Sequence, residues 1–76
     1  MKSYLVDIDL AVQSNRSLLP YIHLLGRQGH GFEGKTTDNQ SAVFRGFISN
    51  LSELEKICKD LEHIGGYYRC TVRVML

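Results

Sequence analysis

Residues 14–31 read Ser-Asn-Arg-Ser-Leu-Leu-Pro-Tyr-Ile-His-Leu-Leu-Gly-Arg-Gln-Gly-His-Gly, and this stretch decides the fold. Its apolar residues fall at spacings i, i+3, i+4 and i+7 and form one stripe: Leu18, Tyr21, Ile22 and Leu25, widened by Leu24. We expect Ser17 to cap the first turn, which can hold Pro20, and Gly29 or Gly31 to end the helix. The stretch therefore predicts one short amphipathic helix within residues 17–28.

Strands are predicted on both sides of this helix by apolar residues that alternate with polar ones. The clearest strand runs from Tyr4 to Val12 and turns Asp7 and Asp9 away from its apolar face. Residues 30–37 are a weaker candidate, residues 41–49 form a third strand, and residues 68–76 form the last.

A second helix is predicted between the third and last strands. Asn50 caps it, Glu53 supplies the reciprocal half of a capping box, and Gly65-Gly66 ends it. Its buried stripe consists of Leu54, Ile57, Leu61 and Ile64.

The order strand, helix, strand, strand, helix, strand predicts a ferredoxin-like α+β fold, a βαββαβ sandwich formed by a single domain over residues 1–76. Both helices then cover one face of a four-stranded antiparallel sheet, with the first strand between the third and the last. On the open face we expect a cluster of Asp7, Asp9, Arg45, Arg69 and Arg73. Structural support is the favoured role for this cluster, and an anion site is the alternative.

Composition excludes several classes of protein. Nine basic and eight acidic residues give a net charge of +1, which argues against a nucleic-acid or membrane-surface protein held by electrostatics. No apolar run approaches the ~20 residues that span a bilayer. Asp7 and Asp9 interrupt the apolar run near the amino terminus, so we expect no signal peptide and a cytoplasmic location.

Neither a metal site nor catalytic residues are predicted. Cys58 and Cys70 lack metal-ligand spacing and are expected to be free thiols in a reducing compartment. His23, His30 and His63 have no suitable ligand partner three or four residues away.

Two local features leave alternatives open. The free amides of the loop before the first helix favour a carboxylate, to which Arg16 can add a bidentate contact, but an ordinary cap with a solvated arginine is favoured. Residues 45–48, Arg-Gly-Phe-Ile, match half of the third-strand signature of RNA-recognition domains. Because charge is nearly balanced and Phe47 is the only clear aromatic residue near the centre of that face, we do not expect nucleic-acid binding.

The chain resembles ACT domains, the small amino-acid-sensing modules, over nearly all of its 76 residues. The resemblance lies in the apolar spacing from Leu18 to Leu25 followed by Gly29, and in residues 54–61 with Ile64 before the last strand. Among these domains it is most similar to the short regulatory subunits of acetolactate synthase (acetohydroxyacid synthase), isozyme II type, which are likewise little more than one ACT domain.

This resemblance implies a non-catalytic subunit that binds and activates a large catalytic subunit. The catalytic subunit would carry thiamine diphosphate, Mg²⁺ and FAD and would join two 2-keto acids with loss of CO₂, whereas this chain would hold no cofactor. The resemblance also implies a homodimer that pairs through the second strand, a weak edge. A chain this short buries only about 60% of its unfolded surface, which also favours a partner.

In ACT domains, effectors such as branched-chain amino acids sit between the first loop of one subunit and the second strand of its neighbour. The corresponding candidates here are Ser14, Asn15, Arg16, Ser17, His30 and Phe32. Typical members carry Asp-Arg-Pro-Gly where this chain has Gln13 to Arg16, so an arginine replaces the glycine that admits the effector. The isozyme II type also lacks that glycine, and its enzyme is poorly sensitive to valine.

Two other functions fit the same scaffold. One is a stand-alone amino-acid sensor. The other is a small module that binds nucleic acid or protein, including an inhibitor.

Overall fold

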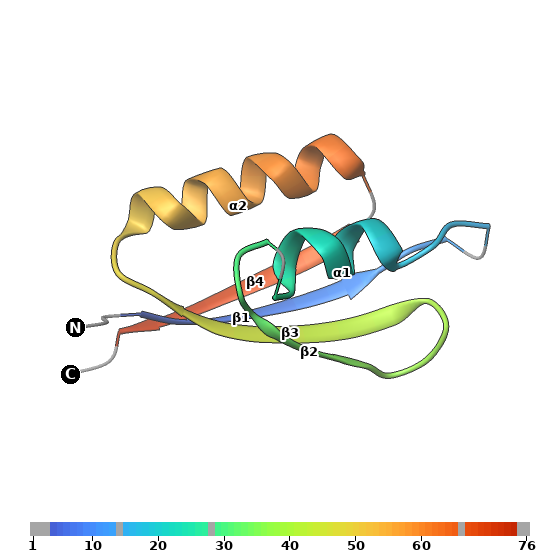
Figure 1. Ribbon diagram of the computed structural model, residues 1–76, viewed down its shortest axis with the longest axis horizontal. Helices are drawn as coiled ribbons and strands as arrows, with labels where there is room; N and C mark the ends of the chain where they lie inside the picture. Colours follow the sequence, from blue (N-terminus) through green and yellow to red (C-terminus); the bar gives the residue numbers. More distant parts are fainter. Residues whose placement is uncertain (1–3, 14, 28, 66, 75–76) are drawn as a thin grey trace.

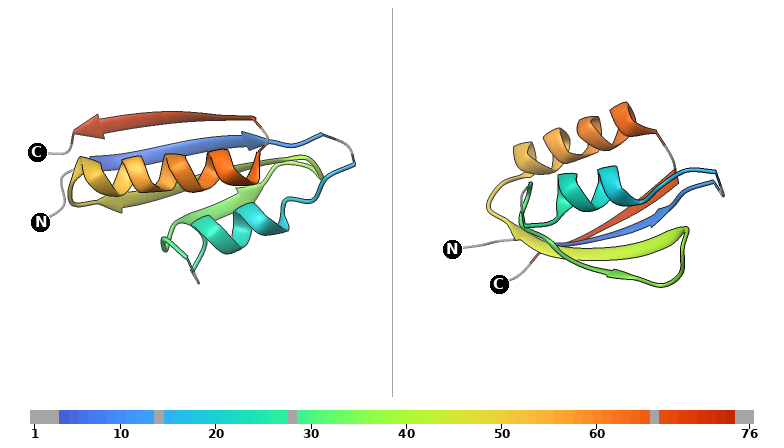
Figure 2. Two further views of the ribbon diagram at one scale, coloured as in Figure 1. Left: turned by 90° about the horizontal axis from the view of Figure 1, so that it is seen from above. Right: turned by 45° about the vertical axis from the view of Figure 1, so that its right-hand side comes forward.

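The computed structural model describes residues 4–13, 15–27, 29–65 and 67–74 of the chain. Six elements follow one another: β1 (Tyr4–Ala11), α1 (Leu19–Leu25), β2 (Glu33–Thr36), β3 (Ser41–Ile48), α2 (Leu51–Ile64) and β4 (Tyr67–Val74). The strands form an antiparallel sheet in the order β2-β3-β1-β4. Both helices lie on one face of it, as Figures 1 and 2 show. The predicted ferredoxin-like α+β fold is confirmed.

The core lies between the helices and the central strand β1. Val6, Ile8 and Leu10 of β1 are buried, and they alternate with Asp7 and Asp9 on the face without helices. The predicted neighbours are confirmed, because β1 pairs with β3 on one side and with β4 on the other. Alternation thus places both aspartates on the face opposite the core, which they share with Leu5.

The helix α2 begins and ends at residues that the sequence indicates. The Asn50 side chain accepts hydrogen bonds from the backbone N–H groups of Ser52 and Glu53 at 3.1 and 3.2 Å. The predicted capping box is shifted by one residue, since the Glu53 carboxylate accepts from Ser49 N rather than from Asn50 N. Gly65 ends the helix with a φ of 91°, a conformation that favours glycine.

The helix α1 is shorter at both ends than predicted. Its N-cap is Leu18, and the Ser17 hydroxyl, one residue earlier, accepts from Leu19 N at 3.0 Å. It ends at Leu25 with Gly26 as its C-cap, and neither Gly29 nor Gly31 has that role. The loop that follows folds back instead, with its N–H groups donating to the last carbonyls of the helix.

Two of these loop bonds account for the early end of α1. His30 N donates to Leu24 O at 2.9 Å, and Phe32 N donates to Leu25 O at 2.7 Å. They satisfy carbonyl groups that a longer helix would have used. Because this loop is taken up in closing α1, β2 begins only at Glu33, whereas the sequence predicted a strand from residue 30.

The fourth strand is less completely covered than its alternation predicted. Tyr68 and Cys70 are half-buried on the helix side, but Val72 is 37% and Val74 is 65% exposed. The end of β4 therefore leaves an apolar strip uncovered. Leu76, also assigned to this strand by its spacing, lies outside the described residues.

Two glycines make room for two aromatic rings in the β2–β3 hairpin. A Cβ at Gly34 would stand 2.3 Å from the ring of Phe44, and one at Gly46 would stand 2.3 Å from the ring of Phe32. Each ring therefore occupies the space that a side chain would need. Although Gly34 weakens β2 as a strand, it is required for this close packing.

Candidate functional site

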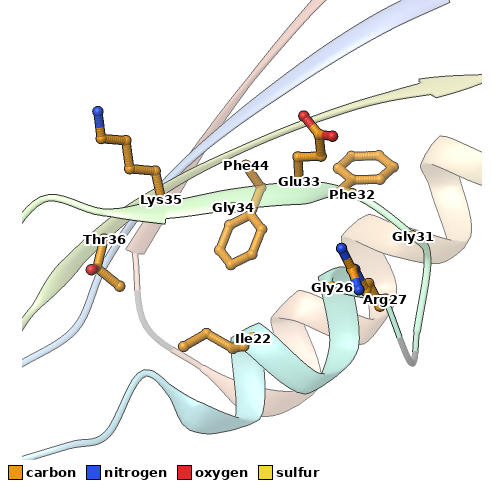
Figure 3. Close-up of a pocket in the computed structure, with 10 residues that line it drawn as sticks. All are labelled: Ile22, Gly26, Arg27, Gly31, Phe32, Glu33, Gly34, Lys35, Thr36 and Phe44. Atoms are coloured by element: carbon orange, nitrogen blue, oxygen red, sulfur yellow. The ribbon is translucent and has the colours of Figure 1, made fainter.

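A groove of about 690 Å³ lies between α1 and β2. The residues that define its character are Ile22 and Arg27 from the helix side, Phe32, Gly34 and Thr36 from the strand side, and Phe44 from β3. In Figure 3 the Phe44 ring and the Ile22 side chain point into the space between the strand and the helix. The groove therefore combines apolar side chains with a comparable share of polar surface.

Local sequence keeps this groove open. Gly26, Gly31 and Gly34 bring backbone without side chains to its wall. Glu33 and Lys35 point to the other side of β2 in Figure 3, as their pairing with Arg45 and Val43 requires. Arg27 contributes a basic residue to the lining just after α1, and the lining also includes Lys35 and the acidic Glu33. An aliphatic group bearing a carboxylate fits these walls chemically.

The predicted effector loop precedes α1 and lies at its N-terminal end, whereas the returning loop follows its C-terminal end. Asn15, Arg16 and Ser17 are exposed in the β1–α1 loop and do not line this groove, whereas Ser14 lies outside the described residues. The Arg16 guanidinium donates from Nη2 to Ile64 O at 3.2 Å and lies beside Gly65. It thus satisfies a terminal carbonyl of α2, where a cation is favourable.

The other two effector candidates follow α1. His30 Nε2 lies 3.5 Å from Asp60 Oδ2 of α2, and an ion pair forms there when the histidine is protonated. Phe32 is buried, and its ring packs over Gly46 while lining the groove. Within one chain, the structure therefore does not bring the loop candidates and the candidates around β2 together.

The open face of the sheet carries the charged residues. Arg45 donates to both carboxylate oxygens of Asp7, from Nε at 2.6 Å and from Nη2 at 3.2 Å, and Arg73 Nη2 lies 3.9 Å from Oδ2. Asp9 faces Arg69 in the β1–β4 register, but in the described part of the chain they form no ion pair. The cluster is therefore centred on Asp7, whose charge the two arginines neutralise.

The hydrogen bonds from Arg45 hold the pKa of Asp7 below its ordinary value of 3.8, against the opposing effect of burial. The same bonds raise the pKa of Arg45. Because the folded state favours ionised Asp7, the resulting stability is present above that ordinary value and is lost as pH falls through the lower, folded-state pKa. This behaviour is that of a structural ion pair rather than of an acid–base catalyst.

Sequence reasoning missed the groove although it placed several of its residues. Alternation put Phe44 on the helix-covered face, and the apolar stripe contained Ile22. What spacing could not indicate is that a short α1 leaves this end of the face uncovered. Arg27, which follows the helix, carried no recognisable signal.

Comparison with known proteins finds no matching family model, no matching curated protein and no matching solved structure. Within the described residues, no helix is both long and apolar enough to cross a bilayer. In the same part of the chain, His, Cys, Asp and Glu side chains form no group of three that could hold a metal ion.

Proposed function

We propose that this chain is a non-catalytic regulatory subunit of the ACT type that binds and activates the large catalytic subunit of an acetolactate synthase in the cytoplasm. The fold carries the proposal: βαββαβ order, with the apolar stripe of α1 packed on the sheet and an exposed edge strand beside it. Regulation then requires only that the subunit prefer the active conformation of its partner, because such preference shifts the equilibrium of the partner.

Activation is tested directly by mixing. The purified chain is titrated into an acetolactate synthase large subunit supplied with thiamine diphosphate, Mg²⁺ and FAD, and acetolactate is assayed. We expect the rate to rise and to level off at a fixed subunit ratio. An unchanged rate, with the chain shown to be folded by circular dichroism, would contradict the proposal.

The proposed subunit is a homodimer joined through β2. All four residues of β2 are exposed, and its free edge can pair with a second copy. Antiparallel pairing centred on Gly34 places Glu33 opposite Lys35 of the second copy, and the reverse contact follows by symmetry. The strand is therefore complementary in charge to itself.

Charge exchange tests this pairing. Glu33→Lys sets like charges opposite each other and is expected to weaken the dimer in sedimentation experiments. The double variant Glu33→Lys with Lys35→Glu restores opposite charges and is expected to restore association. A folded wild-type monomer at micromolar concentration, or equal behaviour of the two variants, would count against this interface.

The groove favours amino-acid sensing as a second candidate function. Ile22 and Phe44 suit the side chain of a branched-chain amino acid, and Arg27 suits its carboxylate. In the proposed dimer, the second copy lies along β2 and can complete the groove from outside. Calorimetry with valine, leucine and isoleucine tests this, with Arg27→Gln as the matched variant. No heat with any of the three would remove the sensor hypothesis.

A further inference from the structure

Two cysteines lie on neighbouring elements, Cys58 on α2 and Cys70 on β4. Cys58 follows the buried Ile57 on α2, and Cys70 pairs with the buried Ile8 in the β1–β4 register. Both thiols are free and half-buried. Burial raises the pKa of Cys70 and of Tyr68, and an interaction of each side chain with the neighbouring Cys58 raises it further.

A contact between Tyr68 and Glu62 shows how β4 is aligned with α2. The Tyr68 hydroxyl lies 3.4 Å from Glu62 Oε2, so this point of β4 faces this point of α2. The two elements run in opposite directions, as Figure 2 shows. Cys58 lies four residues before Glu62, a helical step of about 6 Å. Cys70 lies two residues after Tyr68, a strand step of about 6.6 Å, so both steps lead to the same level.

We propose that Cys58 and Cys70 form a reversible disulfide within one chain when the protein meets a hydroperoxide. The bond links α2 to the edge strand β4. The proposal concerns this contact alone and does not rest on the regulatory function proposed above.

The two thiols take different parts in the oxidation. Burial, together with the neighbouring Cys58, raises the pKa of Cys70, so Cys70 stays protonated until it reacts. One of the two thiols attacks the peroxide: its sulfur gains one oxygen as the O–O bond breaks, giving a sulfenic acid and water. The sulfur of the other cysteine then loses its proton and attacks the oxidised sulfur, and a second water leaves. In total, two thiols and one hydrogen peroxide give one disulfide and two waters, and a dithiol reductant reverses the change.

The cross-link would act where the sheet is least covered. Beyond Cys70, the side chains of Val72 and Val74 are exposed, so α2 covers only the first part of β4. In the reduced protein, Tyr68 and Cys70 provide the half-buried contacts of this strand with the helix layer. The disulfide would therefore hold this edge of the sheet against α2.

The test uses the full chain, reduced and then treated with hydrogen peroxide. Remaining thiols are alkylated, and intact mass and peptide mapping identify the product. We expect loss of two hydrogen atoms, a Cys58–Cys70 linked peptide, a rate independent of protein concentration, and full reversal by dithiothreitol. Cys58→Ser and Cys70→Ser are the matched controls, and each is expected to give no internal cross-link.

Wild-type protein unfolded in guanidinium provides a second control that does not depend on the folding of a variant. There the internal disulfide should form more slowly, because the fold no longer holds the two sulfurs together. The proposal is overturned if folded wild type keeps both thiols alkylatable, passes to sulfinic acid, or links only between chains. It is equally overturned if unfolding does not slow the reaction.

Discussion

The two helices cover the same sheet but are defined in different ways. The fourteen-residue α2 has a side-chain cap at Asn50 and a glycine with positive φ at Gly65. The seven-residue α1 has no hydrogen bond from a side chain at its N-cap, and a returning loop satisfies its last carbonyls. Short helices are marginal in isolation, so α1 depends on the packing of Tyr21 and Leu25 into the core.

This difference indicates that local signals specify α2, whereas tertiary contacts specify α1. It also explains why the groove lies at α1: a short helix leaves β2 uncovered. The following comparisons between matched positions test it, from the largest expected effect to the smallest.

Removing the deepest leucine of each helix should give the largest losses. Leu25 and Leu61 are both almost completely buried, so Leu25→Ala and Leu61→Ala are each expected to lower the free energy of unfolding by about 2–5 kcal/mol. Urea denaturation measures the loss, and amide hydrogen exchange locates it. Leu25→Ala should remove protection throughout α1, whereas Leu61→Ala should leave the first turn of α2 protected. If each variant loses amide protection uniformly along its helix, the proposed difference between α1 and α2 is contradicted.

The glycines that follow the helices give the next comparison. A Cβ at Gly29 would stand 1.8 Å from Leu24 O, so Gly29→Ala must displace the returning loop and should cost about 3 kcal/mol. At Gly65 the cost is backbone strain at φ 91°, expected at about 1–2 kcal/mol for Gly65→Ala. Thermal unfolding measures both, with Val43→Ala as an exposed control. A larger loss of stability at Gly65 would contradict the conclusion that the end of α1 depends more on tertiary contacts than the end of α2 does.

For the N-terminal caps we expect the larger loss of stability at α2, which is the reverse of the order expected for the glycines. Asn50→Ala removes the acceptor for two backbone N–H groups of α2 and should cost about 0.5–2 kcal/mol. Ser17→Ala removes one acceptor in an exposed loop and is expected to cost less. Chemical denaturation of the two variants under the same conditions checks the order, and equal losses would show that α1 is capped as strongly as α2.

Two tyrosines give the smallest expected effects. Burial raises the pKa of Tyr68 to about 12, above the ordinary value of 10.0. As pH rises, the unfolded chain therefore loses the Tyr68 proton before the folded chain does. The free energy of unfolding then falls between pH 10 and pH 12. Tyr68→Phe should weaken that alkaline loss. The buried Tyr21 hydroxyl has no partner among the described residues, so Tyr21→Phe should be nearly neutral at pH 7. Urea midpoints across this pH range test both, and an unchanged alkaline slope in Tyr68→Phe would contradict the assignment.

Most of the fold was predictable because its signals are short-range. Period-two alternation assigned β1 and β3 to two-faced strands, and Asn50 marked the start of α2. The bounds of α1 and β2 were wrong because loop amides compete for the helix carbonyls, and no local residue signals that competition. For the candidate site, the sequence placed Phe32 within the second strand, whereas it lies just before β2, and Arg27 and the open wall of the groove emerged only from the packing.

By itself, the sequence determined the order of elements, the apolar faces of β1, β3 and the two helices, and the position of the charged residues on the open face. These follow from periodicity and capping, which act over a few residues. Only the tertiary structure decided that Arg16 binds the last carbonyl of α2 and that aromatic rings fill the space above Gly34 and Gly46. Such contacts join residues that are distant in the chain, and their energies depend on distances that spacing along a sequence does not contain.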